Sequence, residues 1–278
     1  MNPVTKALWY IDSHYAQDIT LEDVAACAGV SRFHLLRAFG TATGRSIMGY
    51  VRGRRLTDAA HRLAAGAEDI LGVALEAGYG SHEAFTRAFR EQFGVTPESV
   101  RREGSALHLD LQEQITMSNI PVPDLKSPRF VQGRTLLLAG LAQHYACDGS
   151  SAGIPGQWQK FGPYIDNIPG KAGDAAYGVC YNTDEAGDMD YLCAVEVKQF
   201  AGLAPELTTL RVPEKRYAVF AHDDHISMIR GTWNAIWNHW LPESGHEVAD
   251  APFFELYPPA FDPQTGNGGV ELWVPLKS

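Results

Sequence analysis

The sequence of 278 residues lacks the features that mark several classes of protein. Its four cysteines, at positions 27, 147, 180 and 193, form no Cys-x-x-Cys pair and lie too far apart for a small disulfide framework or a zinc ribbon. No apolar run approaches the roughly 18 residues that a membrane span needs, and no basic segment followed by an apolar one opens the chain. We therefore expect a cytoplasmic protein that does not bind a membrane.

An excess of basic residues is also missing, because the formal net charge is −10. The acidity is unevenly distributed: residues 1–107 carry 12 basic and 12 acidic side chains, so the whole charge of −10 falls on the remainder. The first part can approach phosphates, whereas the second repels them or attracts cations. This asymmetry predicts two domains with different tasks, as the chain length also does.

A proline-rich stretch separates the two parts. Prolines 121, 123 and 128 disfavour helix and favour extended backbone. Helical patterns precede them and strand-like patterns follow. The sequence thus predicts a multidomain protein with an all-α domain over 1–107, a linker over 108–128 and an α+β domain over 129–278.

The N-terminal part contains an internal repeat. Val24-Ala25 recurs 49 residues later, and Arg37-Ala38-Phe39 recurs 50 residues later. Each copy has an apolar-periodic helix, a glycine turn, a serine that can cap the next helix, and a second helix. The pattern predicts two helix-turn-helix motifs, joined by a helix of about 18 residues that spans roughly 27 Å.

The second helix of each motif leaves side chains that can contact DNA. Successive major-groove faces lie about 34 Å apart, so one chain could place both helices in adjacent major grooves of double-stranded DNA without dimerising. Arginine can fork onto guanine, and threonine or an apolar ring can meet a thymine methyl group. The candidate DNA-binding residues are Arg32, Phe33, Leu36 and Arg37 in the first copy, and His82, Glu83, Thr86, Arg87 and Arg90 in the second.

Residues 5–104 resemble the twin helix-turn-helix domain of AraC/XylS-type transcription regulators. The resemblance is carried by the segments Ile19 to Phe39, Arg52 to Ala60 and Ala77 to Pro97. It implies that Phe33, Leu36 and Arg37 contact bases from the first recognition helix. His82, Glu83, Thr86 and Arg87 would do so from the second.

The C-terminal part predicts a duplicated α+β unit. Its elements follow the order strand, helix, strand, strand, and then broadly the same again, which suggests one sheet-rich domain with a cleft between two halves. The predicted strands cover 134–141, 177–181, 191–197, 207–212, 217–222, 253–257 and 270–274, and the predicted helices cover 154–165 and 226–240.

An acid and several aromatic residues suggest a ligand pocket in this part. Glu271 and Trp273 share one face of the last strand, and we expect Tyr191 at the corresponding parity in the first half. Tryptophans also recur at helical spacing over 226–240. With the acidic charge, these residues predict an aromatic pocket that holds a lipophilic cation.

The C-terminal part also resembles the GyrI-like effector-binding module. The resemblance is carried by the segments Leu210 to His222, Thr232 to Pro242, Phe253 to Tyr257 and Val270 to Pro275. It implies a pocket in which Glu271 is the carboxylate, and the implied walls are Trp158, Tyr191 and Trp273.

Three other functions remain open. Some relatives of this module resemble hydrolases, and Glu271 could act as a base with Tyr191 as proton donor. His222-Asp-Asp-His225 offers four possible metal ligands, although Asp223 or Asp224 there is more simply a helix cap. The domain could also bind RNA polymerase rather than a small molecule. We expect a DNA-binding transcription regulator with a small cationic or aromatic effector, and neither an enzyme nor a protein with a cofactor or metal.

Overall fold

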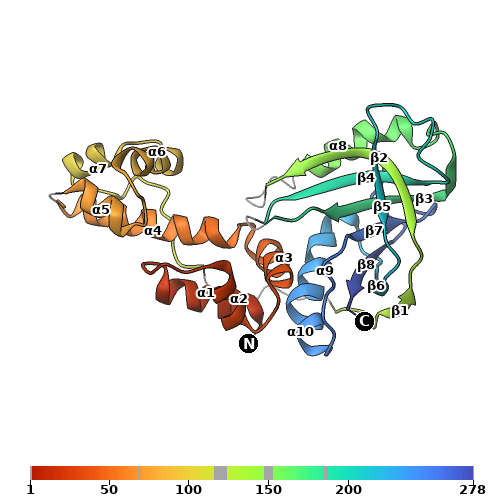
Figure 1. Ribbon diagram of the computed structural model, residues 1–278, viewed down its shortest axis with the longest axis horizontal. Coiled ribbons are helices and arrows are strands. Elements are labelled where there is room, and N and C mark those ends of the chain that lie inside the picture. The colour runs from red at the N-terminus through yellow and green to blue at the C-terminus, as the bar shows by residue number, and fades with distance from the viewer. Residues whose placement is uncertain (1, 68, 116–123, 147–152, 185–186, 278) are drawn as a thin grey trace. The chain divides into compact units, whose positions relative to one another are not determined.

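The computed structural model describes residues 2–67, 69–115, 124–146, 153–184 and 187–277. The chain divides into two compact units (Figure 1). The first unit comprises Pro3–Gly29 and Ile47–Ser118, and the second comprises Val30–Ser46 and Asn119–Ser278. The second unit therefore includes a short segment of the N-terminal repeat.

The helices of the N-terminal part begin and end where their capping residues predict. Thr20 and Asp23 form a reciprocal capping box, and Gly29 ends the same helix with φ 73°, a left-handed conformation that suits glycine. Ser31 and Ser81 each cap the helix that follows them. The helices are α1 (Pro3–His14), α2 (Leu21–Ala28), α3 (Arg32–Thr43), α4 (Ile47–Ala64), α5 (Ile70–Glu76), α6 (His82–Phe93) and α7 (Pro97–Glu103).

Helix α4 is the predicted connecting helix, and it has 18 residues. Its apolar positions are buried, and Leu56, Ala60 and Leu63 share a core with Phe85 and Phe89 of α6. This core also takes in Ala106 and Leu109, which follow the last helix. The core of the first unit thus extends beyond the end of α7.

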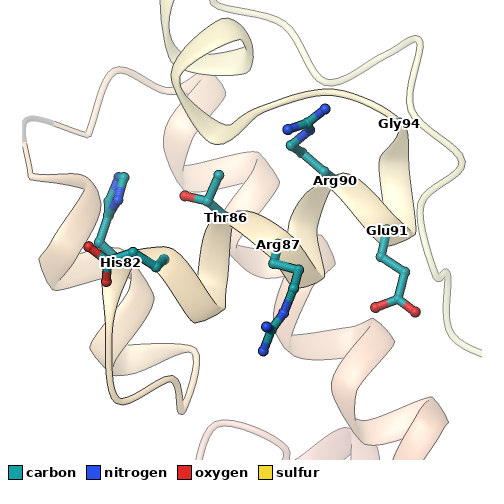
Figure 2. A pocket seen from close by; sticks show the side chains of 7 residues that line it. His82, Thr86, Arg87, Arg90, Glu91 and Gly94 are labelled. Atoms are coloured by element: carbon teal, nitrogen blue, oxygen red, sulfur yellow. The ribbon is translucent and has the colours of Figure 1, made fainter.

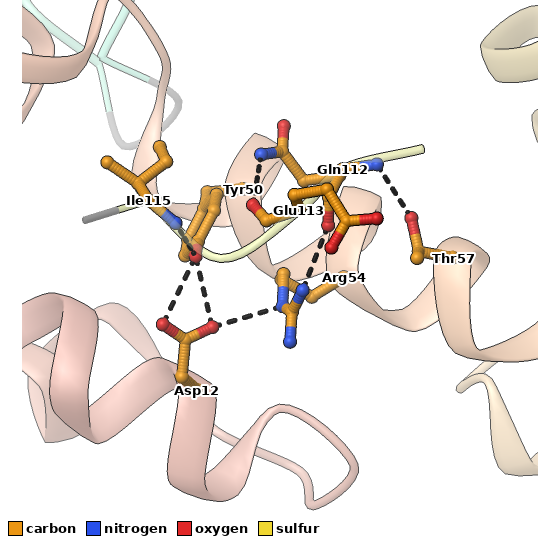
Figure 3. A network of polar contacts seen from close by, with 7 residues as sticks. All are labelled: Asp12, Tyr50, Arg54, Thr57, Gln112, Glu113 and Ile115. Carbon is orange, nitrogen blue, oxygen red and sulfur yellow. Dashed lines mark hydrogen bonds and ion pairs between the residues drawn. The ribbon is translucent and has the colours of Figure 1, made fainter. Parts of the chain in front are cut away.

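A polar network ties residues 112–115 to α4 (Figure 3). The backbone N–H of Gln112 donates to Thr57 Oγ1 at 2.8 Å, and the Gln112 carbonyl accepts from Arg54 at 2.9 Å. Tyr50 donates to Asp12, which also pairs with Arg54, and the Tyr50 oxygen accepts from the Ile115 N–H. The first half of the predicted linker is therefore packed on the first unit, and prolines 121 and 123 lie outside the described residues.

The second unit contains one antiparallel sheet of eight strands. Every predicted strand is confirmed, and the sequence missed one edge strand, β1. The order across the sheet is β1-β6-β8-β7-β3-β4-β2-β5. The strands are β1 (Arg129–Gln132), β2 (Leu136–Tyr145), β3 (Lys171–Tyr181), β4 (Met189–Val197), β5 (Thr208–Val212), β6 (Arg216–His222), β7 (Phe253–Tyr257) and β8 (Val270–Leu276).

The predicted duplication is present in this sheet. One half runs β2, α8, β3, β4, and the other runs β6, α9, β7, β8, with β3 and β7 paired where the halves meet. The predicted helix over 226–240 is divided into three segments of different pitch, a 3-10 helix, an α-helix and a π-helix. The helical segments are α8 (Ile154–Phe161), η2 (Gly162–Tyr164), η3 (Ile226–Met228), α9 (Ile229–Ala235), the π-helix η4 (Ile236–Trp240) and α10 (Leu241–Glu243).

Strand register decides which side chains share a face of the sheet. Glu255 pairs with Gly178 on one side and Leu272 on the other, and Gly178 pairs with Cys193. Directly paired residues point to the same face, so Glu255 shares its face with Cys193 and with Tyr191, two residues away on the same strand. Helices α8 and α9 contribute side chains that contact this face.

The opposite face carries an apolar core. Trp273 pairs with Phe254, which belongs to a buried cluster with Val179, Leu192 and Tyr217. Glu271 lies on the same face as Trp273. The prediction that Tyr191 shares a face with Glu271 is therefore wrong, because a shift of one residue in register moves a side chain to the other face.

Candidate functional site

Glu255 is the buried carboxylate of the second unit. Its exposed fraction is 8%, and three aromatic donors hold it. Tyr191 and Tyr257 both donate to Oε2 at 2.8 Å, and the Trp233 indole N–H donates to Oε1 at 3.0 Å. These donors come from β4, β7 and α9, so the site needs both halves of the sheet.

Burial fixes the protonation of the two phenols. It raises the pKa of Tyr191 and Tyr257 well above the ordinary value, and the neighbouring Glu255 raises it further. Both phenols consequently stay protonated and act as donors to the carboxylate. In the part of the chain that the structure describes, no cationic side chain pairs with Glu255, whose partners are all neutral.

Helix α8 completes one wall of this site. The Trp158 indole N–H donates to the Tyr191 hydroxyl oxygen at 3.2 Å, and its ring lies edge-on to Tyr257 at 4.9 Å between centroids. Gln157 is buried and donates to the carbonyls of Leu141 and Tyr191, which fixes α8 to the sheet. The structure thus brings together two of the predicted wall residues, Trp158 and Tyr191. We call Glu255, Tyr191, Tyr257, Trp233 and Trp158 the Glu255 cluster.

Glu271 does not belong to the Glu255 cluster. Its side chain is 33% exposed and pairs with Arg129 at 2.6 Å, while Trp273 donates to its other oxygen at 3.0 Å. Because Glu271 and Tyr191 lie on opposite faces, they cannot act together as base and proton donor. The predicted pocket with Glu271 and Tyr191 side by side is therefore wrong, whereas ligand binding by Glu271 itself stays a prediction.

Trp273 packs against the apolar core on the face opposite the Glu255 cluster. Its ring stacks on Phe254 at 5.2 Å and meets Tyr217 edge-on at 5.4 Å. Arg129 lies over its exposed side, 5.3 Å from a ring centroid. Trp273 and Tyr191 therefore do not form one wall, because the register places them on opposite faces, and ligand binding by Trp273 stays a prediction.

The sequence contained a signal for Glu255 that we missed. Glu255 and Tyr257 alternate within the segment Phe253 to Tyr257, which already carried the family resemblance. An acid inside an otherwise apolar strand is the less common arrangement and deserved more weight than an acid near a chain end. Nothing in the spacing of residues, however, shows that Trp233 reaches it from α9.

The segment His222 to His225 has structural partners. His222 is buried and hydrogen-bonds Thr232 at 2.8 Å, and Asp223 pairs with Lys126. The His225 side chain, not an aspartate as we expected, caps the following turn through Ser227. Over the described ranges no three His, Cys, Asp or Glu side chains are grouped to hold a metal.

Helix α6 presents an open polar face in the first unit (Figure 2). His82, Thr86 and Arg90 recur every four residues on α6, and Arg87 stands beside them. His82, Arg87 and Arg90 are exposed, and Thr86 is half-buried. These residues line an open depression with Glu83, Glu91 and Gly94. The predicted DNA-binding residues His82, Arg87 and Arg90 of the second recognition helix are therefore exposed to solvent.

Glu83 also stabilises the start of α6. Hydrogen bonds with its own backbone and with Ser81 hold its pKa below the ordinary value, so it is ionised. An anion in the first turn is favourable at the positive end of a helix. Glu83 thus has a local role in addition to its place on the open face.

Helix α3 differs from α6. Leu36 and Arg37 are 8% and 7% exposed, so the prediction that they face outward is wrong, whereas Arg32 is exposed and Phe33 half-buried as expected. The reason is that α3 packs against α9 and η4 within the second unit. The side chains of the two recognition helices are thus in different environments.

Comparisons with known proteins agree with both parts of the chain. Residues 127–277 match the model of the GyrI-like small molecule binding domain, and residues 24–103 match a helix-turn-helix domain. The chain belongs to the GyrI-like family. The GyrI-like part is joined to an AraC-type helix-turn-helix part, and the chain is a DNA-binding transcription regulator with a small-molecule-binding domain.

Relatives of the chain include transcription regulators of two lengths. The transcriptional regulator Rob of Salmonella typhimurium is 26% identical over 95% of this chain and 93% of Rob. The regulatory protein SoxS of Escherichia coli is 38% identical over 33% of this chain and 86% of SoxS. The structure of SAV2435 bound to tetraphenylphosphonium covers 55% of this chain and 95% of that one, with 24% identity and a TM-score of 0.48. Over the described residues, no helix is both long enough and apolar enough to cross a membrane.

Proposed function

We propose that this GyrI-like regulator senses a lipophilic monovalent cation at the Glu255 cluster. The observation that carries the proposal is a buried carboxylate whose described partners are neutral aromatic donors. A buried anion gains most from a partner of opposite charge that brings no competing hydration, and aromatic faces also attract cations. The acidic charge of the C-terminal part increases the local concentration of cations around it.

Tetraphenylphosphonium is a suitable probe, because its single positive charge is enclosed by four phenyl rings. In calorimetric titration of the full chain, we expect Glu255→Gln to weaken its binding by about tenfold or more, which corresponds to at least 1.4 kcal/mol. Glu271→Gln is the matched control and should bind it as the unchanged chain does. Equal losses in the two variants would contradict the assignment of Glu255.

The second part of the proposal concerns DNA. Helix α6 offers Arg87 and Arg90 on an open face with His82 and Thr86, which suits a major groove. Arg32, Phe33, Leu36 and Arg37 remain the proposed DNA contacts of α3, and base contacts by Leu36 and Arg37 require α3 to leave the packing described above. The operator would be read by one chain in two adjacent grooves.

The DNA contact is tested by Arg87→Ala. If Arg87 forks onto guanine, the variant should lose about 1 to 3 kcal/mol of specific binding and relax the preference at one base pair. Arg102→Ala removes an exposed arginine from the last turn of α7, outside α6 itself, and serves as control. Footprints and affinities that are identical in both variants would refute the role of α6.

Two predictions about this part stand beside the proposal. The predicted hydrolase needs Glu271 as base and Tyr191 as proton donor on one face, but these residues lie on opposite faces, and it is Glu255 that is hydrogen-bonded to Tyr191. The high pKa of Tyr191 and the relatives among transcription regulators favour sensing over catalysis. Contact with RNA polymerase stays a prediction.

A further inference from the structure

The first recognition helix, α3, is held by the same unit that contains the Glu255 cluster. Of the α3 side chains proposed to contact bases, Leu36 and Arg37 are buried in this structure. A side chain cannot be buried against protein and lie in a major groove at once. The packing of α3 and its binding to DNA therefore exclude each other.

Arg37 occupies an aromatic site on the second unit. Its guanidinium lies 4.5 Å from the centroid of Phe253 and 5.3 Å from that of Phe33, and Nη1 contacts the Met189 sulfur at 3.2 Å. A guanidinium over an aromatic face is a favourable cation–π contact, and desolvation strengthens it. Arg37 is thus the cation of a site that the GyrI-like part supplies.

The surface that packs against α3 includes the backbone carbonyl of Trp237, which has no hydrogen-bond donor within its own helix. In the π-helix η4 the Leu241 N–H donates to the Ile236 carbonyl, and the next donor in that ladder would be residue 242. Pro242 has no N–H, so the Trp237 carbonyl lacks its helical partner. His34 of α3 supplies one through Nε2, at 2.6 Å.

Two further side chains bind the backbone of α3. Asn238 is buried and donates to the Ala38 carbonyl at 3.0 Å. Arg230 donates to the Thr41 and Gly40 carbonyls at 3.2 and 3.4 Å, close to the C-terminal end of α3. A cation is favourable there, because the last carbonyls of a helix carry partial negative charge.

The α3 contacts and the Glu255 cluster share residues of α9 and β7. Trp233 donates to Glu255, stacks on Trp237 at 5.7 Å and meets Phe253 edge-on at 5.1 Å. Phe253 in turn receives Arg37. Because Trp233 contacts Phe253, a cation placed beside Glu255 and Trp233 would share one aromatic cluster with Arg37, and like charges within one cluster repel each other.

We propose that the surface of α9 and η4 is a receptor for α3 that competes with DNA, and that a cation at the Glu255 cluster shifts α3 towards DNA. The proposal rests on the proposed function, since it takes α3 as a recognition helix and Glu255 as the cation site. The ligand acts only through its preference for the state in which Arg37 has left Phe253.

The test uses the full chain and changes the receptor rather than α3. Arg230→Ala and Asn238→Ala remove contacts to the α3 backbone without changing a proposed base-contacting residue, and Arg230 is exposed, so its replacement leaves no cavity in a core. Arg211→Ala, an exposed arginine of β5, is the control for loss of one positive charge. Affinity is measured by fluorescence anisotropy on a duplex selected from a random pool with the unchanged chain. Hydrogen exchange of residues 32–43 is measured without DNA.

We expect both receptor variants to exchange the α3 amides faster and to bind the duplex about threefold to tenfold more tightly, with Arg211→Ala unchanged or weaker. Tetraphenylphosphonium should raise the DNA affinity of the unchanged chain and should not do so in Glu255→Gln. If hydrogen exchange of the α3 amides is unchanged in both receptor variants, the α9 and η4 surface is not a receptor for α3, whatever the DNA affinity. Faster exchange with no gain in DNA affinity would overturn the competition. Failure of Arg87→Ala to weaken binding would instead count against the proposed function of α6.

Discussion

At the scale of single residues, the site depends on one position where a side chain is not tolerated. Gly178 lies directly opposite Glu255 in the sheet. A Cβ atom there would lie 2.0 Å from the Tyr191 hydroxyl and 2.8 Å from Glu255 Oε2. The close approach of donor and carboxylate is therefore possible only because residue 178 is glycine.

Gly178→Ala should consequently lose cation binding and destabilise the fold. We expect a cost of about 1 to 3 kcal/mol, as for overpacking in a core, measured by thermal unfolding together with tetraphenylphosphonium titration. Gly156→Ala, on α8 with no atom within 4 Å of the new Cβ, is the control and should be neutral or slightly stabilising. A variant at 178 that binds the probe normally would show that the Glu255 cluster is not the site.

Residue types could be predicted from the sequence, but their partners could not. The capping residues Thr20, Ser31 and Ser81 act locally, and each caps its helix as its position indicates. Glu255 and Glu271 differ in burial only because strand register places them on opposite faces. Register is fixed by pairing between distant strands, and no local pattern reveals it.

At the scale of elements, helix α3 is the one whose environment differs most from expectation. Its inward positions Leu35, Ala38 and Phe39 are buried as predicted, but Leu36 and Arg37 are buried as well. Helix periodicity indicates which residues are apolar, and it does not indicate how many surfaces an amphipathic helix meets. A second surface, here that of α9 and η4, can cover what the sequence marks as exposed.

The contact of α3 predicts a dependence on pH. Burial lowers the pKa of His34 below the ordinary 6.5, and the bond to the Trp237 carbonyl only partly offsets this. A histidine with a depressed pKa contributes stability above its unfolded pKa and loses it as pH falls. The unchanged chain should therefore lose stability below about pH 6.5 relative to His34→Gln, which keeps a donor but does not titrate. Parallel Tm curves of the two proteins between pH 8 and 5 would contradict this.

Helix α4 shows the opposite outcome, because its predicted length of about 18 residues is confirmed. Its arginines are among the 12 basic side chains counted over residues 1–107. Arg54 instead pairs with Asp12 and the Gln112 carbonyl, and Arg55 donates to the carbonyls of Tyr15 and Gln17. A count of basic residues in the sequence thus overstates the number of arginine side chains that are available to contact DNA phosphates.

At the scale of the whole molecule, two domains share one chain of uneven charge. The N-terminal part is neutral overall, and the C-terminal part holds the net charge of −10. The proposal involves two states. In one, α3 packs on the acidic C-terminal part, and in the other α3 is free to bind DNA. Regulation then requires no more than a difference in ligand affinity between the two states.

The proposed equilibrium between α3 packed on the second unit and α3 bound to DNA must obey thermodynamic linkage. If tetraphenylphosphonium raises the affinity for the selected duplex by some factor, the duplex should raise the affinity for tetraphenylphosphonium by the same factor. Titration of tetraphenylphosphonium with and without saturating duplex measures this change in affinity. A gain in only one direction would mean that the two ligands do not act through one equilibrium.

The junction of the two half-sheets has a further consequence. The halves repeat one another, yet at the row where β3 meets β7 one half supplies Glu255 and the other supplies Gly178, which has no side chain. A frame with twofold character thus holds a single negative charge on one side. If Glu255 binds the effector, as we propose, we expect a preference for ligands that carry one positive charge and a single orientation for an unsymmetrical ligand.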